Sequence, residues 1–112
     1  MNGSQLTIYA NQSHRIGHLS VVDWLLDQAK QSEVTGATVI EATAGIGSHG
    51  KYHAARFFEL ADQPVGVTVV ADDALIDRLF ARLRESGECL FYTRVPIEYG
   101  ELGDEQVAKG SR

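Results

Sequence analysis

Glycines alternate with cationic and titratable side chains in residues 44–56, AGIGSHGKYHAAR. Glycine lets backbone N–H groups approach a ligand closely and adopt positive φ at little steric cost. Successive exposed N–H groups form a concave surface that attracts anions, and Lys or Arg nearby adds full positive charge. We therefore predict a phosphate-binding loop; the alternative is a hairpin connection that is rich in glycine only because it must turn. The candidate ligand-binding residues are Gly45, Gly47, His49, Gly50, Lys51, His53 and Arg56.

The composition is that of one ordinary globular domain, with 44% hydrophobic and 22% charged residues in a chain of 112. A net charge of −5 argues against broad electrostatic attraction to nucleic acid or to an anionic membrane. The single cysteine, Cys89, excludes an intrachain disulfide, and we expect it to be a small packed residue. The sequence shows neither a signal peptide nor an apolar stretch of membrane-spanning length. We therefore predict a cytoplasmic protein that is not embedded in a membrane.

Hydrophobic periodicity predicts four strands, at residues 6–10, 37–43, 65–70 and 90–95, while residues 54–61 fit either a helix or a strand. Two helices are expected to begin after Ser20 and Asp72, whose side chains can accept hydrogen bonds from the first helical turn. Gly87 is placed to end the second helix. This spacing leaves Trp24 outside the first buried stripe. The predicted stripes are Val22, Leu25, Leu26 and Ala29, and then Ile76, Leu79, Phe80 and Leu83.

The order strand, helix, strand, strand, helix, strand predicts an α+β fold of the ferredoxin-like βαββαβ type. Right-handed crossovers place both helices on one face of a four-stranded antiparallel sheet. The strands are nevertheless apolar at both alternating positions, as Val69 and Val70 illustrate, whereas a sheet with one wet face should alternate more cleanly. We therefore expect further copies of the chain to cover the second face. Residues 1–99 are predicted to form the domain and residues 100–112 a polar C-terminal tail.

Three other interpretations, as a dinucleotide-binding protein, a metal-binding protein or an enzyme, are weaker. Residues 45–50 match the dinucleotide-binding G-x-G-x-x-G pattern, but the break at Gln63 and Pro64 leaves too short a helix for a Rossmann unit. The pairs His49/His53 and His14/His18 have a spacing that could bind a metal ion on a helix, yet neither pair lies in a clear helix. No catalytic motif accompanies them, so an enzyme is not predicted.

Three runs of sequence together resemble one protein family. They are LTIY at residues 6–9, GATVI at residues 36–40, and GIGSHGK at residues 45–51 with His53 following. Pro64, followed by a valine-rich strand that ends at Asp72, fits the same pattern. Over about residues 6–95 the chain thus resembles the PII-like proteins catalogued as domain of unknown function 190.

This resemblance implies a homotrimer with a ferredoxin-like fold. In PII relatives an adenine nucleotide (ATP, ADP or AMP) sits in clefts between subunits, and the loop between the second and third strands reports its presence to a partner protein. The implied loop positions here are Gly45, Gly47, His49, Gly50, Lys51 and His53. True PII proteins also grip phosphate with a glycine–lysine loop after the second helix, where this chain has Gly87-Glu88-Cys89.

We therefore predict a PII-like signalling protein without a required cofactor, which binds an adenine nucleotide and reports to a transporter or an enzyme through residues 44–56. Two alternatives remain open from the sequence. One is a metal-binding trimer that resembles the divalent-cation-tolerance proteins. The other is an adaptor without a small ligand that docks on a transporter.

Overall fold

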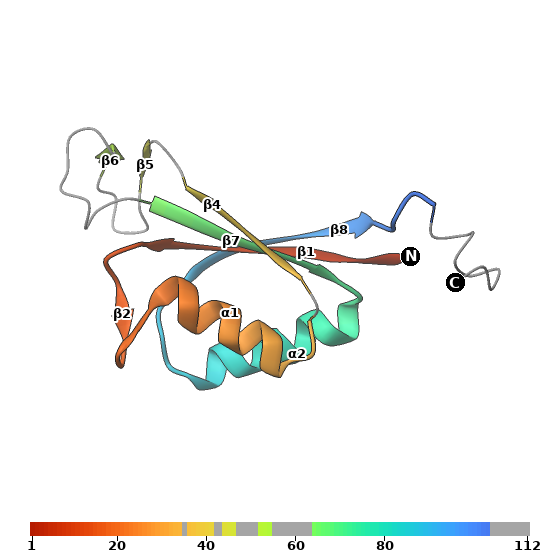
Figure 1. The fold of residues 1–112 in the computed structure, drawn as a ribbon, viewed down its shortest axis with the longest axis horizontal. Helices are drawn as coiled ribbons and strands as arrows, with labels where there is room; N and C mark the ends of the chain where they lie inside the picture. Colours follow the sequence, from red (N-terminus) through yellow and green to blue (C-terminus); the bar gives the residue numbers. More distant parts are fainter. Residues whose placement is uncertain (35, 42–43, 47–51, 55–63, 104–112) are drawn as a thin grey trace.

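The fold is a four-stranded antiparallel sheet with two helices on one of its faces (Figure 1). The computed structural model describes residues 1–34, 36–41, 44–46, 52–54 and 64–103. The predicted ferredoxin-like α+β fold is confirmed. The strand order is β4-β7-β1-β8, and the main elements are β1 (Asn2–Asn11), α1 (Val21–Gln31), β4 (Ala37–Glu41), β7 (Pro64–Ala71), α2 (Asp73–Glu85) and β8 (Phe91–Glu98).

The hydrophobic core lies between the sheet and the two helices. Leu6 and Ile8 of the central strand β1 are 0% and 2% exposed, and they lie directly opposite Val69 and Val67 of β7. The helices close this layer with apolar side chains that are also buried. They are Val21, Trp24, Leu25 and Ala29 of α1 and Ile76, Leu79 and Leu83 of α2.

The buried face of α1 differs from the predicted stripe. Trp24 belongs to the core, with 9% of its surface exposed, whereas Val22 and Leu26 are only partly buried. The first six positions of this helix carry five apolar residues, so several faces of the helix are compatible with burial. Packing on the sheet selects the face that begins at Val21.

The helix boundaries follow the predicted local signals. The Ser20 side chain accepts a hydrogen bond from the Asp23 backbone N–H, and the Asp72 side chain accepts one from the Leu75 N–H. Gly87, at φ 77°, follows α2 with the left-handed backbone that glycine adopts without strain. Each of these helix boundaries depends only on residues that are close together in the sequence.

Two short hairpins interrupt segments that the sequence suggested were loops. One consists of β2 (Arg15–Ile16) and β3 (Leu19–Ser20) and turns through Gly17, at φ 64°. The other consists of β5 (Ala44–Ile46) and β6 (Tyr52–Ala54).

The prediction for Cys89 was wrong because its side chain is exposed and not packed. Of residues 54–61, whose secondary structure was left open, Ala54 ends β6 and residues 55–61 lie outside the described residues.

The burial of Trp24 generates a prediction about stability. Trp24→Ala should lower the free energy of unfolding by about 3 kcal/mol or more, because it leaves a cavity beneath α1. Val22→Ala, two positions away and only partly buried, should cost less than half as much. Urea unfolding measures both, followed by circular dichroism because Trp24 is the only tryptophan. Equal losses would contradict the observed burial.

Candidate functional site

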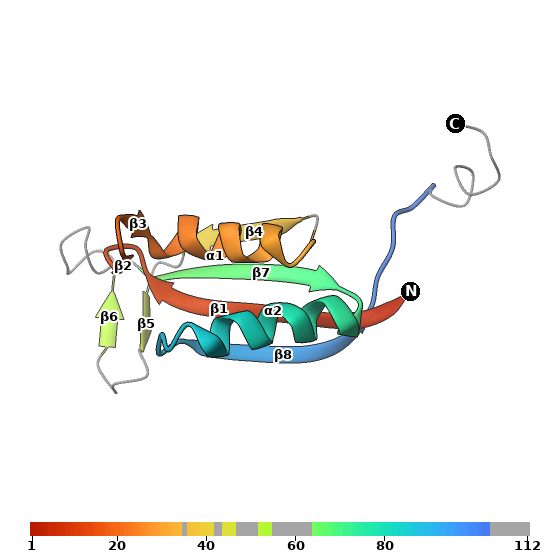
Figure 2. The same ribbon diagram turned by 90° about the horizontal axis from the view of Figure 1, so that it is seen from below.

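Several chain connections meet at one end of the sheet, which we call the loop end. The register places the end of β1, the end of β4, the start of β7 and the start of β8 there, since Asn11 lies opposite Pro64, Tyr9 opposite Phe91 and Glu41 opposite Val65. Both short hairpins lie at this end (Figure 2). Residues 44–56, which we call the glycine segment, belong to the connection from β4 to β7, which leaves the sheet and returns to it at the loop end.

Two side-chain contacts tie these connections together. Gln12, just after β1, donates a hydrogen bond from Nε2 to Oε2 of Glu41 at 3.0 Å. His14 Nε2 lies 3.4 Å from Oε1 of Glu88, which belongs to the turn between α2 and β8. The His14 carbonyl also accepts a hydrogen bond from the first residue of α1, Val21. The connection after β1 therefore contacts β4, α1 and the turn before β8.

The glycine segment is described only in part. Gly45 and His53 lie directly opposite each other in the β5–β6 hairpin. Gly47, His49, Gly50, Lys51 and Arg56 lie outside the described residues, so their role in ligand binding stays a prediction.

Charged groups of both signs surround the loop end. Arg15 and His18 are exposed on the β2–β3 hairpin, and an Arg15 guanidinium nitrogen donates to the His18 carbonyl. Glu88 places a negative charge at the turn after α2, 3.4 Å from His14. An anion is therefore better accommodated on the side of the hairpins than at the turn before β8.

The histidine pair His14/His18 gains no further support as a metal site. Within the described part of the chain, no group of three or more His, Cys, Asp or Glu side chains is arranged to hold a metal ion. A protein zinc site normally needs at least three such ligands. The contact of His14 with Glu88 instead explains its place in the structure.

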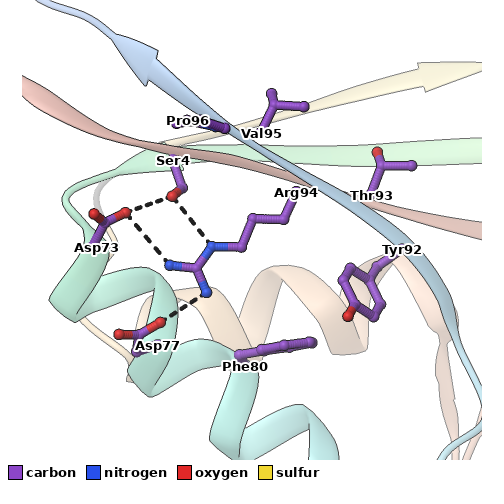
Figure 3. A pocket seen from close by; sticks show the side chains of 9 residues that line it. All are labelled: Ser4, Asp73, Asp77, Phe80, Tyr92, Thr93, Arg94, Val95 and Pro96. Carbon is purple, nitrogen blue, oxygen red and sulfur yellow. Dashed lines mark hydrogen bonds and ion pairs between the residues drawn. The ribbon is translucent and has the colours of Figure 1, made fainter.

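A second polar cluster lies between α2 and the edge strand β8, in an open hollow of about 870 Å³ (Figure 3). Arg94 projects from β8 toward the helix, where its Nη1 donates to Oδ1 of Asp77 at 2.7 Å and its Nη2 lies 3.4 Å from Oδ1 of Asp73. Its Nε donates to the Ser4 hydroxyl at 3.2 Å, and Ser4 in turn donates to Asp73. The cluster thus joins β1, β8 and α2.

The partners of Arg94 leave it little capacity for a ligand. The hydrogen bond to Asp77 raises the pKa of Arg94, and Asp73 adds to the effect while partial burial opposes it. With two carboxylates around one guanidinium, the hollow carries net negative charge and would repel phosphate. We interpret the cluster as a structural connection and not as the ligand site.

A family model matches residues 3–98, almost the whole described domain. It is that of domain of unknown function 190, described as an uncharacterized ACR. The chain belongs to the DUF190 family. No curated protein matches it significantly, and among the described residues no helix has the length and apolar character needed to cross a membrane.

Solved structures share the DUF190 fold seen here. CPII from Thiomonas intermedia K12, a nitrogen regulatory PII-like protein bound to ADP, AMP and bicarbonate, superposes with a TM-score of 0.66 at 20% identity, over 90% of this chain and 91% of that one. A putative PII-like signaling protein from Thermus thermophilus gives 0.67 at 17% identity, over 94% and 95%. A DUF3240 family protein from Shewanella baltica gives 0.60 at 15% identity, over 90% and 97%. At such low sequence identities, these superpositions show a common fold and nothing further.

Sequence reasoning missed the His14–Glu88 contact and the Arg94 cluster. His14 and Glu88 are far apart in the sequence, and no local pattern joins them. The position of Arg94 could have been predicted from strand alternation. Arg94 lies on the same face of the sheet as the core residue Leu6 opposite it, which is the face that the helices cover. The Asp77 side chain is largely exposed, yet it is the closest partner of Arg94.

The Arg94 cluster yields a prediction for this DUF190 domain. Arg94→Met should lower the free energy of unfolding by about 1 kcal/mol, because Ser4 loses a partner inside the fold while the exposed carboxylates are rehydrated. Arg78→Met is the matched control, since Arg78 forms an exposed pair with Glu33 at 2.8 Å. Its cost should stay below about 0.5 kcal/mol. Urea unfolding of both variants checks this, and a larger loss in the control would refute it.

Proposed function

We propose that the protein is a PII-like regulator that binds an adenine nucleotide between subunits of a homotrimer. Its residues 44–56 then report the bound nucleotide to a partner protein. One observation carries the proposal: the glycine segment leaves and rejoins the sheet at the loop end, where the chain's connections converge. The family membership and the fold shared with ADP- and AMP-bound CPII support the same ligand class.

In this proposal, different residues of the loop make different kinds of contact with the phosphate. The amides of Gly45, Gly47 and Gly50 supply N–H donors, since glycine allows the closest approach of the backbone. Lys51 and Arg56 neutralise phosphate charge. His49 and His53 add donors whose strength increases on protonation, so binding tightens as the pH falls through the histidine range.

The proposed protein acts by binding and not by catalysis. The nucleotide is a signal, so no cofactor is required, and its differential affinity for two loop conformations shifts their populations. The partner would be a transporter or an enzyme of the cytoplasm. We assign residues 1–99 to the nucleotide-binding domain and residues 100–112 to a tail without a role in the site.

Isothermal titration calorimetry with ATP, ADP and AMP tests nucleotide binding. We expect heat from at least one of the three, and a Lys51→Ala variant should bind it about tenfold more weakly, because a charge-assisted contact contributes roughly 1.5 kcal/mol. Lys30→Ala, which removes an exposed charge from the helix layer, serves as the control and should leave the affinity unchanged. No heat from any nucleotide at high protein concentration would exclude the proposed ligand class.

The turn before β8 offers a second test of where the phosphates lie. Glu88→Gln removes a negative charge at the loop end and should raise nucleotide affinity about twofold to threefold at low salt. The gain should shrink as ionic strength rises, since exposed charges are screened. Glu98→Gln, at the far end of β8, is the matched control. Equal effects of the two variants would place the ligand elsewhere.

A further inference from the structure

Strand β8 has one edge that no other strand covers in the part of the chain that the structure describes. It is the last strand in the order β4-β7-β1-β8, and it pairs with β1 along all of its eight residues. Its other edge lies at the border of the sheet (Figure 2). An unpaired edge exposes N–H and C=O groups with which another extended chain can pair. We call this border the free edge.

Hydrogen bonds just beyond β8 show which of its residues point to the free edge. The Tyr99 N–H donates to the Met1 carbonyl at 2.8 Å, and the Met1 amino group donates to the Tyr99 carbonyl at 3.0 Å. In an antiparallel ladder, a pair that exchanges both bonds alternates with a pair whose backbone groups point away. The register of β1 with β8 continues this pair, so the odd-numbered residues of β8 bond to β1. Tyr92 and Arg94 therefore direct their N–H and C=O groups to the free edge.

The position of Pro96 agrees with this assignment. Proline has no N–H, so in a sheet it is tolerated on an edge strand where the missing donor would have faced solvent. Pro96 is an even-numbered residue of β8, and its lack of an N–H therefore costs no bond to β1. It can still accept a bond at the free edge but cannot donate one. The complete donor and acceptor sets at the centre of the free edge thus belong to Tyr92 and Arg94.

Helix α2 forms a wall beside the free edge. The hollow of about 870 Å³ is lined on one side by five consecutive residues of β8, Tyr92 to Pro96, and on the other by Asp73, Asp77 and Phe80. The spacing of these three helix residues places them on one face of α2, and Figure 3 shows that face turned toward β8. Directly opposite side chains in neighbouring strands share a face. Every second side chain of an added strand would therefore enter the hollow, which we call the groove.

The charge of the groove suits a basic side chain. Arg94 is the one cation among the residues that line it, against two carboxylates. Asp73 and Asp77 contact the cluster through Oδ1, and among the described residues no contact engages their Oδ2 atoms. Their side chains are 67% and 65% exposed. The groove can thus take one further cation, whose charge the second carboxylate balances.

We propose that the groove binds an extended segment of a partner protein, which adds a fifth strand to the sheet at the free edge. One Lys or Arg of the segment lies beside Asp73 and Asp77. A residue two positions away is apolar and contacts Phe80 and Tyr92, whose rings meet edge to face at 4.7 Å. Main-chain hydrogen bonds supply affinity in this mode of binding, and alternate side chains supply specificity. The inference goes beyond the proposed nucleotide function and does not depend on it.

Another copy of this chain fits the groove poorly. Its sheet has two edge strands, β4 and β8. The charged residue of β4 is Glu41, which the carboxylates of the groove would repel. The cation of β8 is Arg94, which is already held by carboxylates of its own chain. Neither edge strand brings an unengaged cation. Nucleic acid would meet the same two carboxylates and is also disfavoured.

Hydrogen exchange followed by NMR on the full chain tests the free edge. After correction for intrinsic rates, the amide protons of Tyr92 and Arg94 should exchange about tenfold faster or more than those of Thr93 and Val95, which bond to β1. Equal protection of all four amides would show that another copy already covers the edge. That result would overturn the proposal.

A synthetic probe tests the chemistry of the groove. In the seven-residue peptide TVTKTVT, with both ends blocked, the lysine and both valines face the same side of an extended strand. At millimolar concentration this peptide should bind saturably and protect the amides of Tyr92 and Arg94 from exchange. The peptide TVTETVT should bind about tenfold more weakly, because its carboxylate meets those of the groove. Absence of binding, equal binding of the two peptides, or unchanged exchange at the free edge would each overturn the proposal.

Two matched variants test whether the carboxylates select the cation. Asp77→Asn should weaken binding of TVTKTVT about threefold at low salt, while its amide oxygen can still accept a hydrogen bond from Arg94. Asp27→Asn removes the same charge from the exposed surface of α1 and should leave the affinity unchanged. Circular dichroism verifies that both variants fold, and Asp73→Asn repeats the test at the second carboxylate. Equal affinities of the Asp77 and Asp27 variants would exclude the assigned role. All these measurements omit nucleotide, so their outcome is independent of the calorimetric titrations.

Discussion

The pairing register of the central strand β1 is the constraint on which the rest of this structure depends. Leu6 and Ile8 point into the helix layer, while Thr7 and Tyr9 point to the face of the sheet opposite the helices. Since side chains alternate along a strand, a slip of one residue would exchange the two sets. The threonines would then enter the core and the leucine would face solvent. Pairing with β7 on one side and β8 on the other thus fixes both faces at once.

The sequence was most informative where neighbouring residues determine the structure. Ser20 and Asp72 cap helices through backbone groups three residues away, as their positions in the sequence indicated. The helical phase of α1 was harder to predict. Its first turns are apolar on more than one side, so only the shape of the sheet beneath decides that Trp24 is buried.

The candidate site depends on contacts between distant parts of the chain, and these were the least predictable. His14 meets Glu88 only because β1 and β8 are neighbours in the sheet and their connections reach the same end. Arg94 meets Asp77 because a strand residue and a helix residue face each other across the layer. Local patterns indicate which residues are polar, but only the topology determines which of them meet.

The proposed nucleotide site between subunits would link ligand binding physically to assembly. The glycine segment lies between β4 and β7, and these strands also supply Ile40, Thr68 and Val70 to the face of the sheet opposite the helices. In that proposal, a ligand held between copies at the loop end would bind only when the copies are together. Linkage then requires the ligand to stabilise the assembly by the same free energy with which assembly tightens ligand binding. A regulator built this way responds to the concentration of its own subunits as well as to its ligand.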